Sequence, residues 1–144
     1  MRKGPLLGIG LLAVTSWLAM PAAHAGETTL TSTMSGGEEV PGPGDPDGKG
    51  TASITLDDAK NTACYEFKYE GIGKLTAAHV HTGAKGVAGP PAIDFKPDKN
   101  GDKGCVPVDA TTLKAVRDNP GGHYVNLHTA EYPAGAIRGQ LAKS

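Results

Sequence analysis

The sequence predicts an all-β protein, a β-sandwich with one short helix. Glycine and proline are frequent, with 21 and 11 among 144 residues, and they divide the chain into short segments. Several of these segments alternate between apolar and polar residues, as strands with one buried face do. Only one segment has the spacing of an amphipathic helix. The length suits a single domain.

The clearest predicted strands are residues 51–57 and 63–70. Apolar residues occupy every second position in the first, and aromatic residues do so in the second. The connection over residues 57–61 is short, which predicts neighbouring antiparallel strands. Residues 28–34 are rich in threonine and are also expected to form a strand. Residues 35–50 are rich in glycine and proline, which predicts an irregular surface loop.

The second half of the chain adds further strands. One is predicted over residues 75–82, and two more over residues 123–129 and 136–141. Residues 83–104 are expected to be mostly loop, with a short apolar stretch at 92–95.

The one predicted helix runs from Asp109 to Asp118. Asp109 can cap its start, and Leu113 and Val116 share a face. The sequence Asn119-Pro120-Gly121 is a stop signal for the helix.

Residues 1–25 have the layout of a secretory signal peptide. A basic start at residues 1–3 precedes an apolar run from Leu6 to Met20, and the small residues Ala23 and Ala25 flank His24. We expect cleavage after Ala25, a periplasmic or secreted location, and one domain over residues 26–144. The apolar run is short for a membrane span, and no later segment is apolar enough to be one.

Charge argues against two classes of partner. Removal of residues 1–25 takes away two of the 14 basic residues and none of the 15 acidic ones, so the remaining chain is mildly acidic. It has no basic cluster. Nucleic acid and anionic membranes are therefore not expected partners.

The only two cysteines are Cys64 and Cys105. An even number in an exported chain predicts a disulfide bond, which in the loop-entropy description stabilises the fold by about 4 kcal/mol. A thiol pair that binds metal is the alternative, but the sequence has no Cys-x-x-Cys spacing.

Histidines are the candidate functional residues. Four of the five lie after residue 25, as His79 and His81 in one predicted strand and His123 and His128 in another. Since side chains alternate along a strand, His79 and His81 share a face opposite Val80. His128 lies opposite the apolar residues of its own strand, whereas the direction of His123 is open.

Three imidazoles on neighbouring strands can bind one metal ion. Neutral imidazole suits copper, zinc and nickel, and copper binds most tightly in the divalent series. Copper is thus the expected cofactor, with zinc less favoured, and His123 and Met34 are additional candidate ligands. The alternative is that the histidines are ordinary surface residues.

Three segments resemble the CHRD domain, a family first described in chordin and common in exported bacterial proteins. They are residues 34–41 (MSGGEEVP), 78–90 (AHVHTGAKGVAGP) and 124–141 (YVNLHTAEYPAGAIRGQL). The resemblance covers roughly residues 27–142. It implies a Greek-key, immunoglobulin-like sandwich similar to the copper/zinc superoxide dismutases.

That similarity implies that His79, His81 and His128 are copper ligands. The bridging histidine, zinc-site aspartate and electrostatic loop of the dismutases have no counterpart in the sequence, which disfavours zinc. Arg138 could attract an anion to the metal or hold a loop through a carboxylate or backbone carbonyl. Glu131 could orient an imidazole.

These observations favour a non-enzymatic periplasmic copper-binding protein that serves copper homeostasis or delivery. Its expected partners are the copper ion and either another periplasmic copper protein or a second copy of this chain. One alternative is an enzyme with copper-only, superoxide dismutase-like redox chemistry. Another is a metal-free extracellular binding module.

Overall fold

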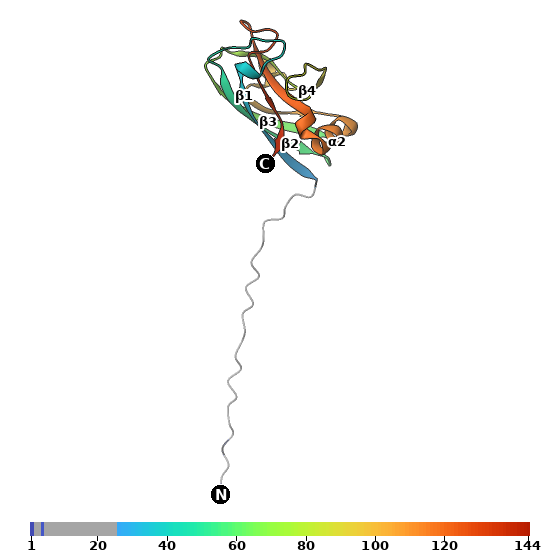
Figure 1. Ribbon diagram of the computed structural model, residues 1–144. Helices are drawn as coiled ribbons and strands as arrows, with labels where there is room; N and C mark the ends of the chain where they lie inside the picture. The colour runs from blue at the N-terminus through green and yellow to red at the C-terminus, as the bar shows by residue number, and fades with distance from the viewer. Residues whose placement is uncertain (2–3, 5–25) are drawn as a thin grey trace.

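The computed structural model describes Met1, Gly4 and residues 26–144, which form a β-sandwich (Figure 1). The predicted signal peptide falls on residues that lie outside this described part, apart from Met1 and Gly4. The strands are β1 (Glu27–Ser35), β2 (Lys49–Asp57), β3 (Thr62–Glu70), β4 (Leu75–Thr82), β5 (Pro91–Asp94), β6 (Lys103–Pro107), β7 (His123–Thr129), β8 (Ile137–Gln140) and β9 (Ala142–Lys143). The helices are α1 (Pro97–Asn100) and α2 (Ala110–Asp118), with 3-10 turns η1 (Gly36–Glu38) and η2 (Pro120–Gly122).

The strands form one continuous antiparallel sheet, which folds over into two layers. Hydrogen bonding gives the order β5-β4-β7-β8-β1-β2-β3-β6, and β9 also pairs with β1. The first four strands make one layer and the last four the other, joined where Ser35 pairs with Arg138. β3 pairs with β6 and β4 with β7, so the chain crosses between the layers more than once. The predicted all-β fold is confirmed.

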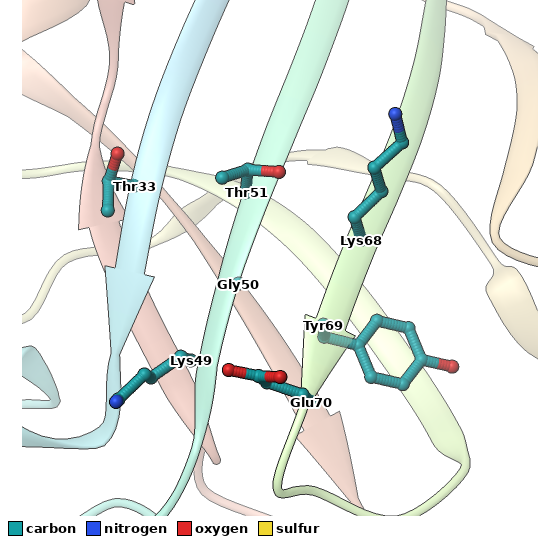
Figure 2. Close-up of a pocket in the computed structure, with 7 residues that line it drawn as sticks. All are labelled: Thr33, Lys49, Gly50, Thr51, Lys68, Tyr69 and Glu70. Atoms are coloured by element: carbon teal, nitrogen blue, oxygen red, sulfur yellow. The ribbon is translucent and has the colours of Figure 1, made fainter.

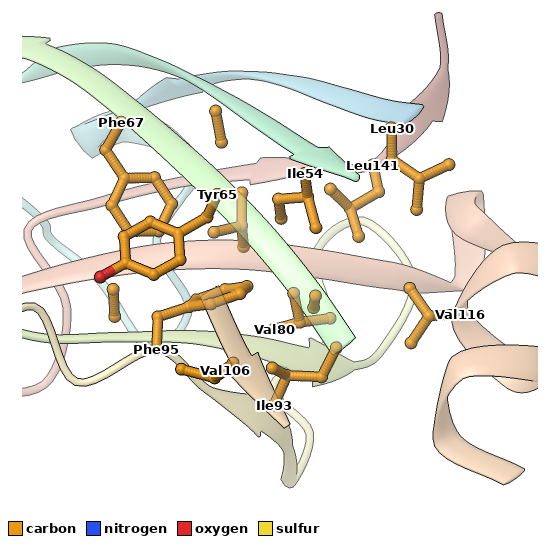
Figure 3. Close-up of a cluster of buried hydrophobic side chains, with 14 of the residues drawn as sticks. Leu30, Ile54, Tyr65, Phe67, Val80, Ile93, Phe95, Val106, Val116 and Leu141 are labelled. Carbon is orange, nitrogen blue, oxygen red and sulfur yellow. The ribbon is translucent and has the colours of Figure 1, made fainter. Parts of the chain in front are cut away.

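Alternating side chains build the core between the layers. On β2, Ala52, Ile54 and Leu56 are at most 2% exposed, while the residues between them face outward. Tyr65 and Phe67 of β3 point inward toward Phe95, with ring centroids 4.7 to 5.5 Å apart among the three (Figure 3).

Helix α2 covers one end of the core (Figures 1 and 3). Asp109 caps it by accepting a hydrogen bond from the backbone N–H of Thr112, at 2.9 Å. Leu113 and Val116 are fully buried. The predicted helix is confirmed, with its cap and its buried face. No helix in the described part of the chain is long and apolar enough to cross a membrane.

Residues 83–104 contain more structure than the sequence predicts. They hold β5, α1 and the first residues of β6. The sequence Lys103-Gly104-Cys105-Val106-Pro107 lacks clear alternation, and β6 forms because it pairs with β3 at the edge of the sheet. Tertiary pairing overrides weak local preference here.

The predicted disulfide bond between Cys64 and Cys105 is confirmed. The two residues are direct partners across β3 and β6, and the bond closes a sequence separation of 41 residues. It therefore attaches the edge strand β6 to the layer covalently.

We expect the Cys64→Ser/Cys105→Ser variant to lose about 4 kcal/mol of unfolding free energy, because the unfolded chain regains the entropy of the open loop. Chemical denaturation of the folded domain with and without reductant measures this loss. Reductant should destabilise the wild type to the level of the variant and leave the variant unchanged. Equal stability of the oxidised wild type and the variant would contradict this role.

Candidate metal centre

Pairing between β4 and β7 brings three histidines together. Val80 pairs with Val125 and both are fully buried, so the alternate positions of both strands face away from the core. His79, His81 and His128 lie on this outer side, and each offers a ring nitrogen within 4.8 Å of those of the others.

The spacing of these nitrogens is close to that of a metal site. His79 Nδ1 and His128 Nε2 are 3.1 Å apart. Two ligands at about 2.0 Å from one ion lie about 2.8 to 3.3 Å apart at angles of roughly 90 to 110°. Even ligands on opposite sides of one ion are at most about 4 Å apart, so a nitrogen near the 4.8 Å limit has to move inward when an ion binds.

Backbone carbonyls orient two of the imidazoles. Nδ1–H of His81 donates to the carbonyl oxygen of Gly89 at 2.8 Å, and Nδ1–H of His128 donates to that of Pro133 at 3.0 Å. In the neutral ring the other nitrogen, Nε2, then carries a lone pair. His81 Nε2 is buried and has no hydrogen-bond partner. Both Nε2 atoms are thus prepared to bind a cation.

His79 uses its other nitrogen. Its Nδ1 faces His128, while its Nε2 lies 3.8 Å from Asp94 Oδ1 on β5. Burial, and next the neighbouring His128, lowers the pKa of His79, although Asp94 opposes the shift. Burial also lowers the pKa of His128. These two rings are therefore held in the neutral form that binds metals.

Arg138 holds the loop that orients His81. Its Nη2 donates to the carbonyl oxygens of Ala84 and Val87, at 2.9 and 2.8 Å. The guanidinium lies 3.4 Å over the Tyr124 ring, which stacks on His81 with centroids 4.9 Å apart. Arg138 thus contacts the loop through two backbone carbonyls rather than through a carboxylate.

Gly89 allows this loop to approach the strand. A Cβ at Gly89 would lie 1.6 Å from the carbonyl oxygen of Thr82, so the loop could not take this path with any other residue. The Tyr124 hydroxyl accepts from the Gly89 N–H at 3.2 Å. The position of the Gly89 carbonyl beside His81 depends on both contacts.

Glu39 and Asn126 adjoin the histidines and are not predicted from the sequence. Asn126 Oδ1 is 3.0 Å from His128 Nε2. Oε1 of the Glu39 carboxyl is buried and has no hydrogen-bond partner. Glu39 is 6% exposed, and burial raises its pKa to about 7 against the opposing charge of Arg138. The Glu-Glu-Val-Pro motif marks Glu39 in the sequence, but nothing there indicates burial.

Three other candidates lie outside the cluster. His123 is buried with the core-facing positions of β7, and its Nδ1–H donates to the carbonyl oxygen of Asn119. Met34 belongs to the hydrophobic core. Glu131 is exposed in the loop after β7. The Pro133 carbonyl, rather than the Glu131 carboxylate, orients the His128 ring.

A small hollow adjoins His79 at the edge of the cluster. It has a volume of about 210 Å³ and is lined by His79 and Asp94 together with residues of α1. A larger hollow of about 390 Å³ lies over Gly50 on the outer face of the other layer. Figure 2 shows Thr33, Thr51 and Lys68 in a row across β1, β2 and β3 there, remote from the histidine strands.

Comparison with known proteins gives one match. The family model of the CHRD domain matches residues 30–141, more than three quarters of the chain. No curated protein and no solved structure shows a significant match. The matched range includes all three clustered histidines and both carbonyls that orient them.

We expect Arg138→Met to loosen the loop around Lys85, because hydrogen bonds from a charged donor contribute about 1.5 to 3 kcal/mol. Limited trypsin digestion should cleave after Lys85 at least about tenfold faster than in the wild type. Cleavage after Lys103 in β6 reports global unfolding and serves as the control. Equal acceleration at both sites would mean that Arg138 stabilises the whole domain rather than this loop.

Glu39→Gln should stabilise the protein more at high pH than at low pH. The folded-state pKa of about 7 exceeds the ordinary 4.5. The folded protein therefore holds this proton more tightly, and its stability contribution falls as pH rises through that interval. The melting temperature of the variant relative to wild type should increase between about pH 5 and about pH 8. A constant difference across this range would contradict the assignment.

Proposed function

The chain belongs to the CHRD domain family, and we propose that it is a copper-binding protein that holds the ion on His79, His81 and His128. The observation that carries this proposal is the unpartnered, buried Nε2 of His81, in a cluster where three imidazoles each offer a nitrogen within 4.8 Å of those of the others. Buried polar atoms usually have a partner, and an unsatisfied one needs an explanation. A cation bound by the three rings supplies it.

The donor set supports copper above other metals. All three donors are imidazole nitrogens, and the copper ion binds such sites most tightly in the divalent series. Both cysteines are in the disulfide bond, so neither offers a thiolate of the kind that structural zinc sites use. His79 and His128 are kept neutral by burial, so little proton competition is expected near neutral pH.

The surroundings favour a binding role in copper homeostasis or delivery in the periplasm or outside the cell. His79 is partly exposed at the hollow beside Asp94, so an ion can pass between this site and a partner. The candidate partners are another periplasmic copper protein or a second copy of this chain. Copper bound in this way can also change between two oxidation states, so superoxide dismutase-like activity is the enzymatic alternative.

Replacing a single histidine tests the proposal. Isothermal titration with Cu(II), in a buffer that competes weakly, should show one ion per wild-type chain. His79→Ala, His81→Ala and His128→Ala should each bind Cu(II) at least about tenfold more weakly, because each loses one donor. His123→Gln is the matched control and should bind like wild type, since His123 lies outside the cluster.

Two outcomes would decide against parts of this function. Wild-type binding weaker than about micromolar, or unchanged binding in all three histidine variants, would favour a metal-free binding module. Superoxide dismutation by the copper-loaded protein above free-copper controls would favour the enzymatic alternative.

A further inference from the structure

Asn126 lies beside the three histidines on the outer face of β7. It is the direct partner of His79 across β4 and β7, and its side chain is almost fully buried, at 4% exposure. Its Oδ1 atom is 3.0 Å from His128 Nε2, nearly the same distance that separates His79 Nδ1 from that nitrogen. By distance alone, Oδ1 belongs with the histidine nitrogens.

Asn126 Oδ1 and His128 Nε2 face each other with no hydrogen between them. The Pro133 carbonyl can only accept, so Nδ1 of the neutral His128 ring carries the hydrogen and Nε2 carries a lone pair. The amide oxygen is also only an acceptor, and it lies 3.0 Å from that lone pair. A cation between the two acceptors would remove their repulsion.

The resulting arrangement concentrates acceptors. Because His128 Nδ1–H donates to Pro133, its Nε2 has a lone pair, and Asn126 Oδ1 has two. His81 Nε2 adds another lone pair without a partner. A buried cation is favoured where several acceptors converge on it, because their coordination compensates for the water that the ion loses.

We propose that Asn126 Oδ1 is a fourth donor to the metal bound by the histidines. The inference rests on the proposed function, because it requires a metal on the histidines. It changes the donor set from three nitrogens to three nitrogens and one neutral oxygen. Oxygen is a harder donor than imidazole nitrogen, so it favours Cu(II) over Cu(I).

Electron paramagnetic resonance of Cu(II)-loaded Asn126→Asp tests the fourth donor. An anionic oxygen in place of a neutral one should lower g∥ and increase the Cu(II)-to-Cu(I) affinity ratio at least about tenfold, which lowers the reduction potential by about 59 mV. Thr82→Asp, which adds the same charge at the exposed end of β4, should leave g∥ unchanged. Asn126→Leu should weaken Cu(II) binding with nitrogen hyperfine from the histidines retained. Circular dichroism and melting temperature show whether each variant is folded.

The outcomes separate the two proposals. A wild-type protein that gives no bound Cu(II) spectrum would overturn both the proposed function and this inference. A wild-type Cu(II) spectrum that is identical in Asn126→Asp would overturn the fourth donor alone.

Discussion

The candidate site depends on the pairing of β4 with β7. Antiparallel register places His79 opposite Asn126 and His81 opposite Tyr124, while Val80 and Val125 between them fill the core. A slip of one residue would turn every one of these side chains to the other face. The hydrophobic core and the polar cluster therefore specify the same register, and neither can change without the other.

Loop carbonyls orient the histidine rings that the strands position. Strand pairing gives the position of each histidine, but the Gly89 and Pro133 carbonyls select the ring nitrogen that is free. Arg138 and Tyr124 connect the first of these loops to the sheet. The outer face of this layer is consequently covered, and His128 is only 9% exposed. A site placed on the outside of a sheet thereby acquires the desolvated surroundings of an interior one.

Strand parity in the sequence was enough to predict the fold class and to group His79, His81 and His128. It was enough because alternation in these strands is regular and the apolar positions are unambiguous. Asn126 shares that parity with His128, yet a lone asparagine carries no chemical signal in a sequence. The burial of Glu39 arises from a glycine-rich loop whose path depends on contacts with distant segments, as Gly135 and Gly44 show. β6 was missed for the same reason, since only its partner β3 makes it a strand.

The disulfide bond affects how the candidate site assembles. The segment between Cys64 and Cys105 contains β4, β5 and the loop at Gly89, and so carries His79 and His81. His128, Asn126 and Arg138 all come later in the chain. Half of the candidate donors thus belong to a segment whose ends are joined covalently, and the other half close over it. The bond limits the conformations open to the first half, so a complete set of donors assembles more readily when the two thiols are oxidised.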